Sequence, residues 1–160
     1  MTIKAGDKFP SVTLKTMGAG GLEGVPTDDL FKGKKVAVFG LPGAYTRTCS
    51  AKHLPGFVAN TDALKAKGVD EIVCVSVNDA FVMNAWGNQH GAAGKVKMVG
   101  DGNAELAKAL GLELDRTANA MGVRMQRFSM IVDNGVVKEL NLEDGDYGKT
   151  SAETLLKHLG

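Results

Sequence analysis

The sequence predicts a single α/β domain in which a central mixed β-sheet is flanked by helices. Apolar runs typical of buried strands alternate with segments of helical periodicity, and the chain ends in a strand hairpin followed by a helix. Its 160 residues are 44% hydrophobic and 23% charged, proportions typical of a soluble globular protein. No repeat, linker or change of composition divides the chain, so we expect one domain over residues 1–160.

The first third of the chain contains two predicted strands and a helix. Ser11–Lys15 alternates between polar and apolar residues like a strand, and the glycine-rich segment 18–24 after it predicts a hairpin or a surface loop. The spacing of these glycines does not fit a dinucleotide-binding fingerprint. Lys35–Leu41 is a nearly continuous apolar run and predicts a buried strand. A helix follows, kinked at Pro55, with an inward face made of Leu54, Phe57, Val58, Thr61 and Leu64.

Strands and helices continue to alternate in the middle of the chain. Ile72–Val77 predicts a second buried strand, and Asn78 is the expected N-cap of the next helix. The inward side of that helix is expected to comprise Phe81, Val82, Ala85, Trp86 and Gln89. Lys95–Val99 is a third candidate strand, and Asp101 is expected to cap a helix over 104–110.

The last third predicts a hairpin and a final helix. Strands over 127–132 and 136–140 flank Asp133-Asn134-Gly135, where the Asn-Gly pair suits a type I′ turn. Thr150 and Glu153 match the capping-box pattern. We therefore expect a C-terminal helix with its inward face made of Leu155, Leu156 and Leu159.

The charge and the apolar pattern exclude several classes of function. Nineteen basic and eighteen acidic residues give a net charge of +1, and no basic patch is interleaved with aromatic residues, so nucleic acid is not an expected partner. The longest apolar runs are too short to cross a bilayer, so we expect no membrane association. The N-terminal residues lack the apolar core of a signal peptide, which makes the cytosol the expected compartment.

Two cysteines are too few for a disulfide framework, and three dispersed histidines predict no metal site. Cys74 lies among valines in a predicted strand, which is typical of a buried structural thiol. Cys49 is surrounded by polar residues where a strand leads into a helix. A thiol in the first helical turn faces unpaired backbone N–H groups and the positive end of the helix dipole, both of which favour the thiolate.

Two neighbours of Cys49 have residue types suited to a reactive thiolate. Pro42 has a fixed φ and no N–H group, so it can shield one side of the sulfur from water. The Thr46 hydroxyl can donate to the thiolate or bridge it to a substrate oxygen. Each residue alone is also common where a strand turns into a helix. The joint spacing Pro42-x-x-x-Thr46-x-x-Cys49 is a far more specific signal than either residue alone.

This spacing resembles the active-site motif of the peroxiredoxins, cysteine-dependent peroxidases with a thioredoxin-like fold. Residues 42–57 resemble the first motif of the type-five subfamily, and segments 76–83 and 127–130 resemble two others. The similarity extends from about Gly6 to the C-terminus. The resemblance implies a thioredoxin-like domain, and we expect the protein to require no cofactor.

The resemblance also implies a mechanism. Cys49, as a thiolate, would attack hydrogen peroxide or an organic hydroperoxide and become a sulfenic acid. Arg127 would be the active-site arginine that stabilises the thiolate and the charge on the departing oxygen. Thr46 and the backbone N–H of Cys49 would complete the catalytic site. The substrate-binding positions would be Pro42, Gly43 and Thr48.

Two positions depart from the pattern of the family. Arg47 stands where many relatives have proline, so it could favour the thiolate or point into solvent. Ser151 stands where some members have a resolving cysteine, and Cys74 is expected to be buried. We therefore expect a one-cysteine cycle in which an external thiol, from glutathione with glutaredoxin or from thioredoxin, reduces the sulfenic acid.

Three alternatives remain open from the residues alone. A thiol–disulfide oxidoreductase usually carries C-x-x-C, which is absent here. A cysteine hydrolase could use His53 as the base for Cys49, since the two lie four residues apart on a helix. A non-catalytic redox sensor or chaperone is the third. The resemblance implies a homodimer packed near the active site, with candidate contacts Tyr45, Phe81 and Met83.

Overall fold

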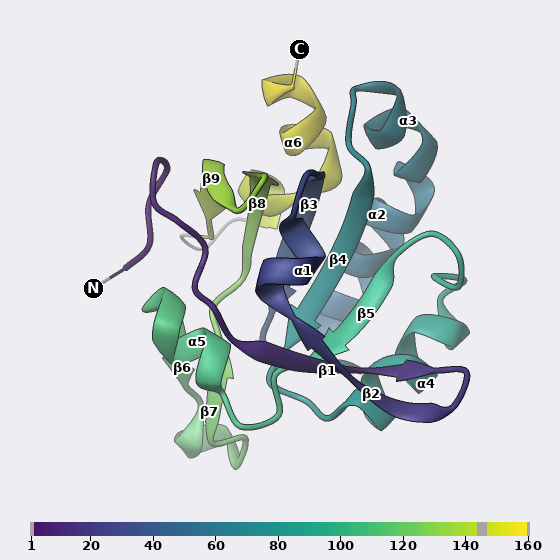
Figure 1. Cartoon of the computed structure of the whole chain (residues 1–160). Helices are drawn as coiled ribbons and strands as arrows, with labels where there is room; N and C mark the ends of the chain where they lie inside the picture. Colours follow the sequence, from purple (N-terminus) through teal and green to yellow (C-terminus); the bar gives the residue numbers. More distant parts are fainter. Residues whose placement is uncertain (1, 144–146, 160) are drawn as a thin grey trace.

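Seven strands form one mixed sheet in the computed structural model, which describes residues 2–143 and 147–159 (Figure 1). The strands of this sheet are β1 (Thr13–Gly18), β2 (Gly21–Pro26), β3 (Lys35–Leu41), β4 (Glu71–Ser76), β5 (Lys97–Gly100), β8 (Phe128–Asp133) and β9 (Val136–Leu142). Their order is β2-β1-β5-β4-β3-β8-β9. The central strands β3, β4 and β5 are parallel, while β1 and β8 pair with them antiparallel. This is the thioredoxin-like α/β fold that the resemblance implies.

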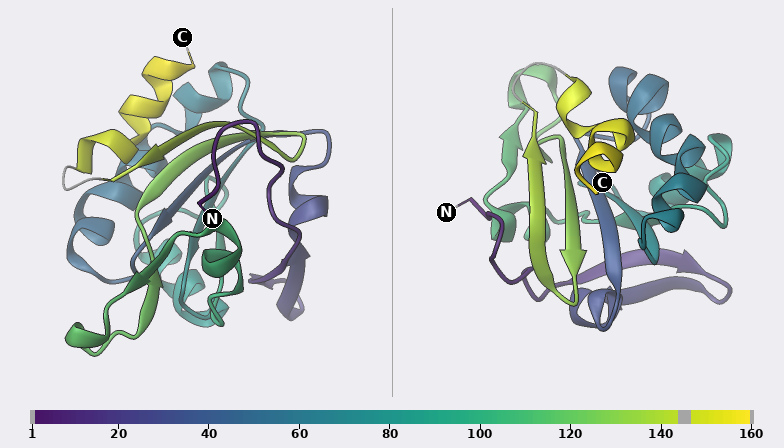
Figure 2. Two further views of the ribbon diagram at one scale, coloured as in Figure 1. Left: turned by 90° about the vertical axis from the view of Figure 1, so that its left-hand side faces the viewer. Right: turned by 90° about the horizontal axis from the view of Figure 1, so that it is seen from above.

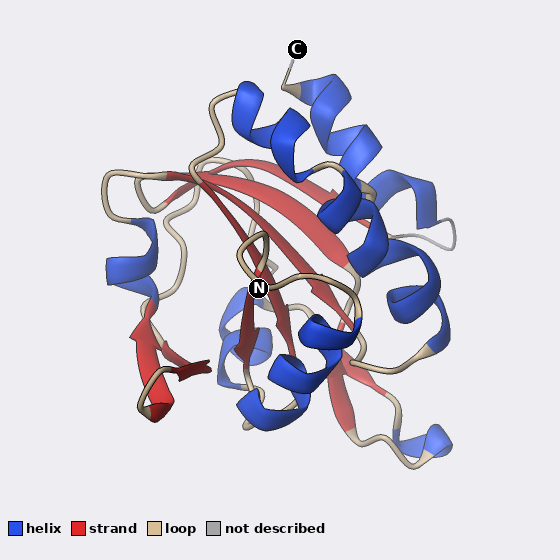
Figure 3. Ribbon diagram, turned by 90° about the vertical axis from the view of Figure 1, so that its right-hand side faces the viewer, coloured by secondary structure: helices blue, strands red, loops and turns tan. Residues whose placement is uncertain are grey.

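Helices cover both faces of the sheet (Figures 2 and 3). The α-helices are α1 (Thr27–Phe31), α2 (Leu54–Ala59), α3 (Thr61–Ala66), α4 (Ala80–Gln89), α5 (Glu105–Leu110) and α6 (Ala152–His158). Three further short segments have helical winding other than α: the π-helical η1 (Cys49–His53) and the 3₁₀ turns η2 (Thr117–Asn119) and η3 (Tyr147–Thr150). No helix in the described ranges is long and apolar enough to span a bilayer.

The core consists of two apolar layers, because side chains along a strand point alternately to opposite faces. In β3, Val36 and Val38 pack with α1 and α5, whereas Ala37 and Phe39 pack with α2, α3, α4 and α6. All of these β3 side chains are buried. A strand buried on both faces must be apolar throughout, which explains the uninterrupted run in the sequence.

Several predicted elements are confirmed. The structure gives β3 the same bounds as the prediction, and segment 18–24 lies in the β1–β2 hairpin. Asn134 and Gly135 both have positive φ, as a type I′ turn requires. The Asp101 carboxylate accepts hydrogen bonds from two backbone N–H groups of α5, as expected of a cap.

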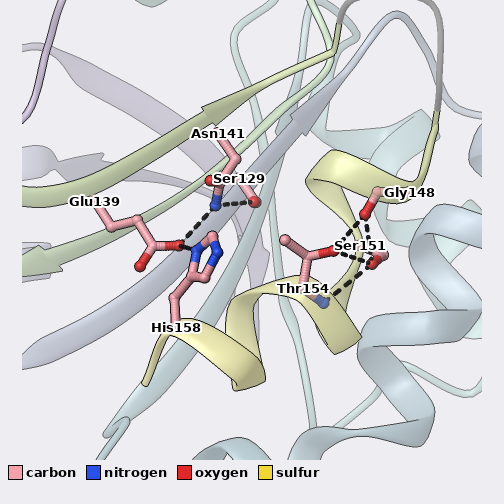
Figure 4. Close-up of polar contacts among 7 residues, drawn as sticks. All are labelled: Ser129, Glu139, Asn141, Gly148, Ser151, Thr154 and His158. Atoms are coloured by element: carbon pink, nitrogen blue, oxygen red, sulfur yellow. Dashed lines mark hydrogen bonds and ion pairs between the residues drawn. The ribbon is translucent and has the colours of Figure 1, made fainter. Parts of the chain in front are cut away.

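Two predicted helix caps are wrong by one residue. Asp79, not Asn78, caps α4 by accepting the Val82 N–H at 2.8 Å. Ser151, not Thr150, caps α6 and accepts the Thr154 N–H at 3.2 Å (Figure 4). In each pair both residue types can cap a helix, so sequence alone does not decide between them.

The predicted inward face of α4 is also partly wrong. Phe81 is 60% exposed, and the buried residues of this helix are Ala80, Met83, Trp86 and Gly87. Burial of Met83 removes it from the candidate dimer contacts. Phe81 and Tyr45 remain exposed.

The helix after β3 is divided into three parts. It begins as the π turn η1, in which the Leu54 N–H donates to the Cys49 carbonyl, and changes to α winding beside Pro55. Proline has no N–H to donate, so it is tolerated at this junction. A second, unpredicted break falls at Asn60, between α2 and α3.

A small second sheet was not predicted. It pairs β6 (Glu113–Asp115) with β7 (Val123–Met125) and is not hydrogen-bonded to the main sheet, although Met125 of β7 packs into the main core (Figure 1). Strands of three residues contain too little alternation to be recognised in a sequence.

Candidate active site

Cys49 lies just beyond the carboxyl end of β3, where the chain turns into η1. Helical winding starts at Arg47, and the Ser50 N–H donates to the Thr46 carbonyl at 3.0 Å. Cys49 is therefore in the first helical turn, as the sequence predicted. Its side chain is fully buried in the layer formed by α2, α4 and α6. The thiol thus lies where backbone N–H groups favour negative charge and bulk water is excluded.

Arg127 directly contacts the Cys49 sulfur. Its Nη2 donates to Cys49 Sγ at 3.1 Å, although the two residues are 78 positions apart in the chain. The sheet explains the contact, because Phe128 at the start of β8 pairs with Gly40 near the end of β3. The guanidinium therefore supplies a fixed positive charge to a thiolate at this position.

His53 holds the other arm of the Arg127 guanidinium. Arg127 Nη1 lies 2.8 Å from His53 Nδ1, and His53 Nε2 lies 3.0 Å from the Thr150 carbonyl oxygen. The pKa of His53 is lowered to about 3, chiefly by burial and in addition by the adjacent Arg127 charge, against the opposing effect of the Thr150 hydrogen bond. The imidazole is therefore neutral at physiological pH.

The depressed pKa of His53 predicts a specific acid sensitivity. Below the ordinary imidazole pKa of 6.5, the unfolded chain binds a proton at His53 that the native state excludes, so stability falls as pH decreases from there towards about 3. We expect His53 to account for a loss of about 2.5 kcal/mol of unfolding free energy between about pH 7 and about pH 4.5. Urea unfolding of the parent and of His53→Asn at both pH values measures this contribution. An equal loss of unfolding free energy between the two pH values in the parent and in His53→Asn would contradict this prediction.

The contacts of His53 also argue against the cysteine-hydrolase alternative. A general base for Cys49 would need a free ring nitrogen directed at the sulfur. Instead, Nδ1 is bonded to Arg127 and Nε2 to the Thr150 carbonyl.

The predicted substrate-site residues lie around the loop between β3 and η1. The Thr46 hydroxyl donates to the Gly43 carbonyl at 2.7 Å rather than to the thiolate, so its remaining lone pairs are available to accept a hydrogen bond. Gly43 is buried, and Pro42 and Thr48 are half-buried.

Three further residues, which were not predicted from the sequence, position this loop. Arg124 Nη1 donates to the Pro42 carbonyl at 3.2 Å, and its Nε donates to the Met121 carbonyl. Asn78 Oδ1 accepts the Ala44 N–H at 3.0 Å and lies 2.8 Å from the hydroxyl of Ser76. Two signals were available for Ser76 and Asn78: they lie at or just beyond the end of β4, which is parallel to β3, and they belong to the segment 76–83 that resembles a family motif.

Two aromatic residues, Tyr45 and Trp86, lie next to the segment that carries Cys49. Tyr45 has a φ of 66°, in the left-handed region, and its ring is half exposed beside Trp86. The buried Trp86 donates its indole N–H to the hydroxyl of Ser50 at 3.0 Å. The residue after Cys49 is thereby fixed to α4.

Cys74 is buried in the middle of β4, between Phe39 of β3 and Met98 of β5. Burial raises the pKa of the Cys74 thiol well above its ordinary value; negative charge on Cys49 adds to this effect, and Arg127 opposes it. These features fit the structural role predicted for Cys74. Among the residues that the structure describes, no three His, Cys, Asp or Glu side chains are grouped to hold a metal ion.

The chain is similar to known proteins over nearly its whole length. Residues 4–156 match the Redoxin family. Peroxiredoxin-2E-2, chloroplastic, of Oryza sativa subsp. japonica is 49% identical over 164 residues, which cover 99% of this chain and 73% of that protein. Peroxiredoxin-2D of Arabidopsis thaliana is 44% identical and 98% of each chain is covered. The crystal structure of reduced Prx3 in complex with H₂O₂ from Vibrio vulnificus has a TM-score of 0.95 and 49% identity, covering 99% of this chain and 100% of that one.

Proposed function

Because the chain belongs to the peroxiredoxin family and is a thiol-dependent peroxidase, we propose that Cys49 is its peroxidatic nucleophile and that it follows the one-cysteine cycle of a type-five member. The observation that carries the proposal is the 3.1 Å hydrogen bond from Arg127 Nη2 to Cys49 Sγ in the first turn of a helix. Both features stabilise the thiolate that the reaction requires.

The proposed first step is attack by Cys49 Sγ on the terminal oxygen of a hydroperoxide. The sulfur electron pair forms the S–O bond, the O–O bond breaks, and the departing hydroxide or alkoxide takes a proton from water. Arg127 stabilises the charge that develops on the departing oxygen. Thr46 Oγ, whose hydrogen is bonded to Gly43, accepts the O–H of the peroxide, and the Cys49 N–H donates to a peroxide oxygen. Pro42, Gly43 and Thr48 line the approach.

We propose that the substrates are hydrogen peroxide and organic hydroperoxides. The relative from Vibrio vulnificus was crystallised in complex with H₂O₂, which supports the first. The fully buried sulfur favours small hydroperoxides over bulky ones.

The one-cysteine cycle is supported by the positions of Ser151 and Cys74. Ser151 is the N-cap of α6 and cannot form a disulfide. Cys74 is bonded into the centre of the sheet, so its sulfur would have to leave the core to reach a sulfenic acid on Cys49. The sulfenic acid is therefore reduced by an external thiol, for which we propose glutathione with glutaredoxin first and thioredoxin second.

Mass spectrometry after one equivalent of peroxide tests this cycle. We expect a sulfenic acid on Cys49, trapped by a dimedone-type reagent, with Cys74 still a thiol. The Cys74→Ser variant should give the same product. A stoichiometric Cys49–Cys74 disulfide, within or between chains, would overturn the one-cysteine cycle, while the peroxidase step itself would stand. A steady-state assay with each reductant then identifies the electron donor.

We further propose that the protein acts as a cytosolic homodimer. Tyr45 and Phe81 expose large apolar rings, with Tyr45 on the active-site loop and Phe81 in the first turn of α4. Exposed aromatic residues are enriched at protein interfaces. Light scattering should give twice the chain mass, and Phe81→Asp should reduce it to that of one chain. The free thiols of Cys49 and Cys74 suit a reducing compartment.

A further inference from the structure

We propose that His53 is a positioning residue for the peroxidase reaction: it holds the Arg127 guanidinium against Cys49 through a neutral, fixed hydrogen-bond acceptor. This inference rests on the proposed roles of Cys49 and Arg127, and it assigns to His53 neither proton transfer nor contact with the peroxide.

Two hydrogen-bond partners of the imidazole, Thr150 and Arg127, determine its tautomer. The Thr150 carbonyl oxygen can only accept a hydrogen bond, so the proton of the ring is on Nε2, 3.0 Å away. The lone pair is then on Nδ1, and it accepts from Arg127 Nη1 at 2.8 Å. Arg127 has no acceptor of its own, so the direction of this bond is also determined.

The imidazole is rigidly held. It is fully buried, with its ring centroid 4.9 Å from that of Phe39 and 5.6 Å from that of Phe57. Those two phenyl rings are themselves stacked at 4.0 Å. Because the ring cannot rotate, the acceptor on Nδ1 fixes one nitrogen of the planar guanidinium. The other nitrogen, Nη2, is then directed at Cys49 Sγ.

A neutral acceptor suits this position better than a carboxylate. A carboxylate would hold the guanidinium equally well, but its charge would offset the positive charge that the Cys49 thiolate needs. A neutral imidazole orients Arg127 and leaves that charge available to the sulfur. The low pKa of His53 keeps the imidazole in this state across the working pH range.

The series of hydrogen bonds from Cys49 through Arg127 and His53 ends at Thr150, in the C-terminal segment. Thr150 ends η3, directly before α6, and the fold fixes this segment at several points (Figure 4). Ser151 Oγ donates to the Gly148 carbonyl at 2.9 Å, and His158 Nδ1 lies 2.6 Å from Glu139 Oε2 of β9. The end of η3 thus orients His53, and His53 orients Arg127.

Three substitutions separate the two hydrogen bonds of His53. His53→Asn keeps an acceptor at the δ position facing Arg127, His53→Gln keeps a donor at the ε position facing Thr150, and His53→Leu keeps neither. We expect the second-order rate constant for hydrogen peroxide to fall about tenfold or more in His53→Leu, since a charge-assisted hydrogen bond is lost. His53→Asn should stay within about threefold of the parent and react faster than His53→Gln. The pH midpoint of the ultraviolet thiolate absorbance should rise in His53→Leu and be restored in His53→Asn.

A double-mutant cycle with Arg127→Ala shows whether the effect passes through the arginine. Once Arg127 is absent, His53→Leu should cause little further loss of rate. Additive losses, or equal rates in His53→Asn and His53→Gln, would reduce His53 to a packing residue and overturn the inference. Circular dichroism establishes that each variant is folded; if His53→Leu is not, the Asn and Gln pair alone decides the outcome. Loss of the proposed function itself would appear differently, as full activity in a variant that lacks Cys49.

Discussion

Replacing Cys49 with serine is expected to reduce peroxide consumption by about a thousandfold or more, because removal of a catalytic nucleophile abolishes the covalent step. A serine hydroxyl remains protonated beside Arg127, and oxygen is a far weaker nucleophile towards the O–O bond than a thiolate. Serine is nearly the size of cysteine, so the buried site should retain its packing. Stopped-flow measurement of hydrogen peroxide consumption in a single turnover checks the result.

Cys74→Ser is the matched control for this prediction. It removes the other thiol of the chain by the same chemical change, from a position that is equally buried. The variant should consume peroxide at close to the parental rate, although it places a hydroxyl in the middle of the sheet and should unfold at a lower denaturant concentration. If Cys49→Ser remained active and Cys74→Ser did not, the assignment of the nucleophile would be reversed.

The second large effect is expected at Arg127. Arg127→Ala removes the cation 3.1 Å from the sulfur, and we expect the rate with peroxide to fall about a hundredfold to a thousandfold. Arg127→Lys keeps the charge but should recover only part of the rate. A single ammonium cannot reproduce the planar fork that contacts Cys49 with one nitrogen and His53 with another.

Arg116→Ala serves as the charge-matched control for Arg127→Ala. Arg116 is exposed next to η2, and its replacement by alanine changes the net charge of the protein by the same amount as Arg127→Ala. Its rate should equal that of the parent under the same salt conditions. Equal losses in the two variants would show that the effect arises from long-range charge rather than from contact with Cys49.

The sequence predicts those parts of the molecule that depend on local chemistry. The apolar run of β3 and the Asn134-Gly135 turn each satisfy a local rule and lie where they were predicted. The position of Cys49 in a first helical turn also follows from its immediate neighbours. For Arg127 the residues alone favour an exposed strand edge, and only the resemblance to a family placed it at the sulfur.

The features that were missed depend on contacts between distant segments. Arg124 reaches Pro42 across 82 positions, and His53 reaches Thr150 across 97, so neither contact has a local pattern. The error at Phe81 has a related cause. Helical periodicity locates an apolar stripe, but it does not show that an apolar residue beside the stripe remains exposed at the protein surface.

The bond between Trp86 and Ser50 gives the protein an internal optical reporter. Trp86 is the one tryptophan of the 160-residue chain, and its indole N–H is fixed to the residue that follows the reactive sulfur. Indole emission responds to changes in hydrogen bonding and polarity close to the ring. Oxidation and reduction of Cys49 should therefore change the fluorescence of the unlabelled protein, so that each half of its cycle can be timed separately.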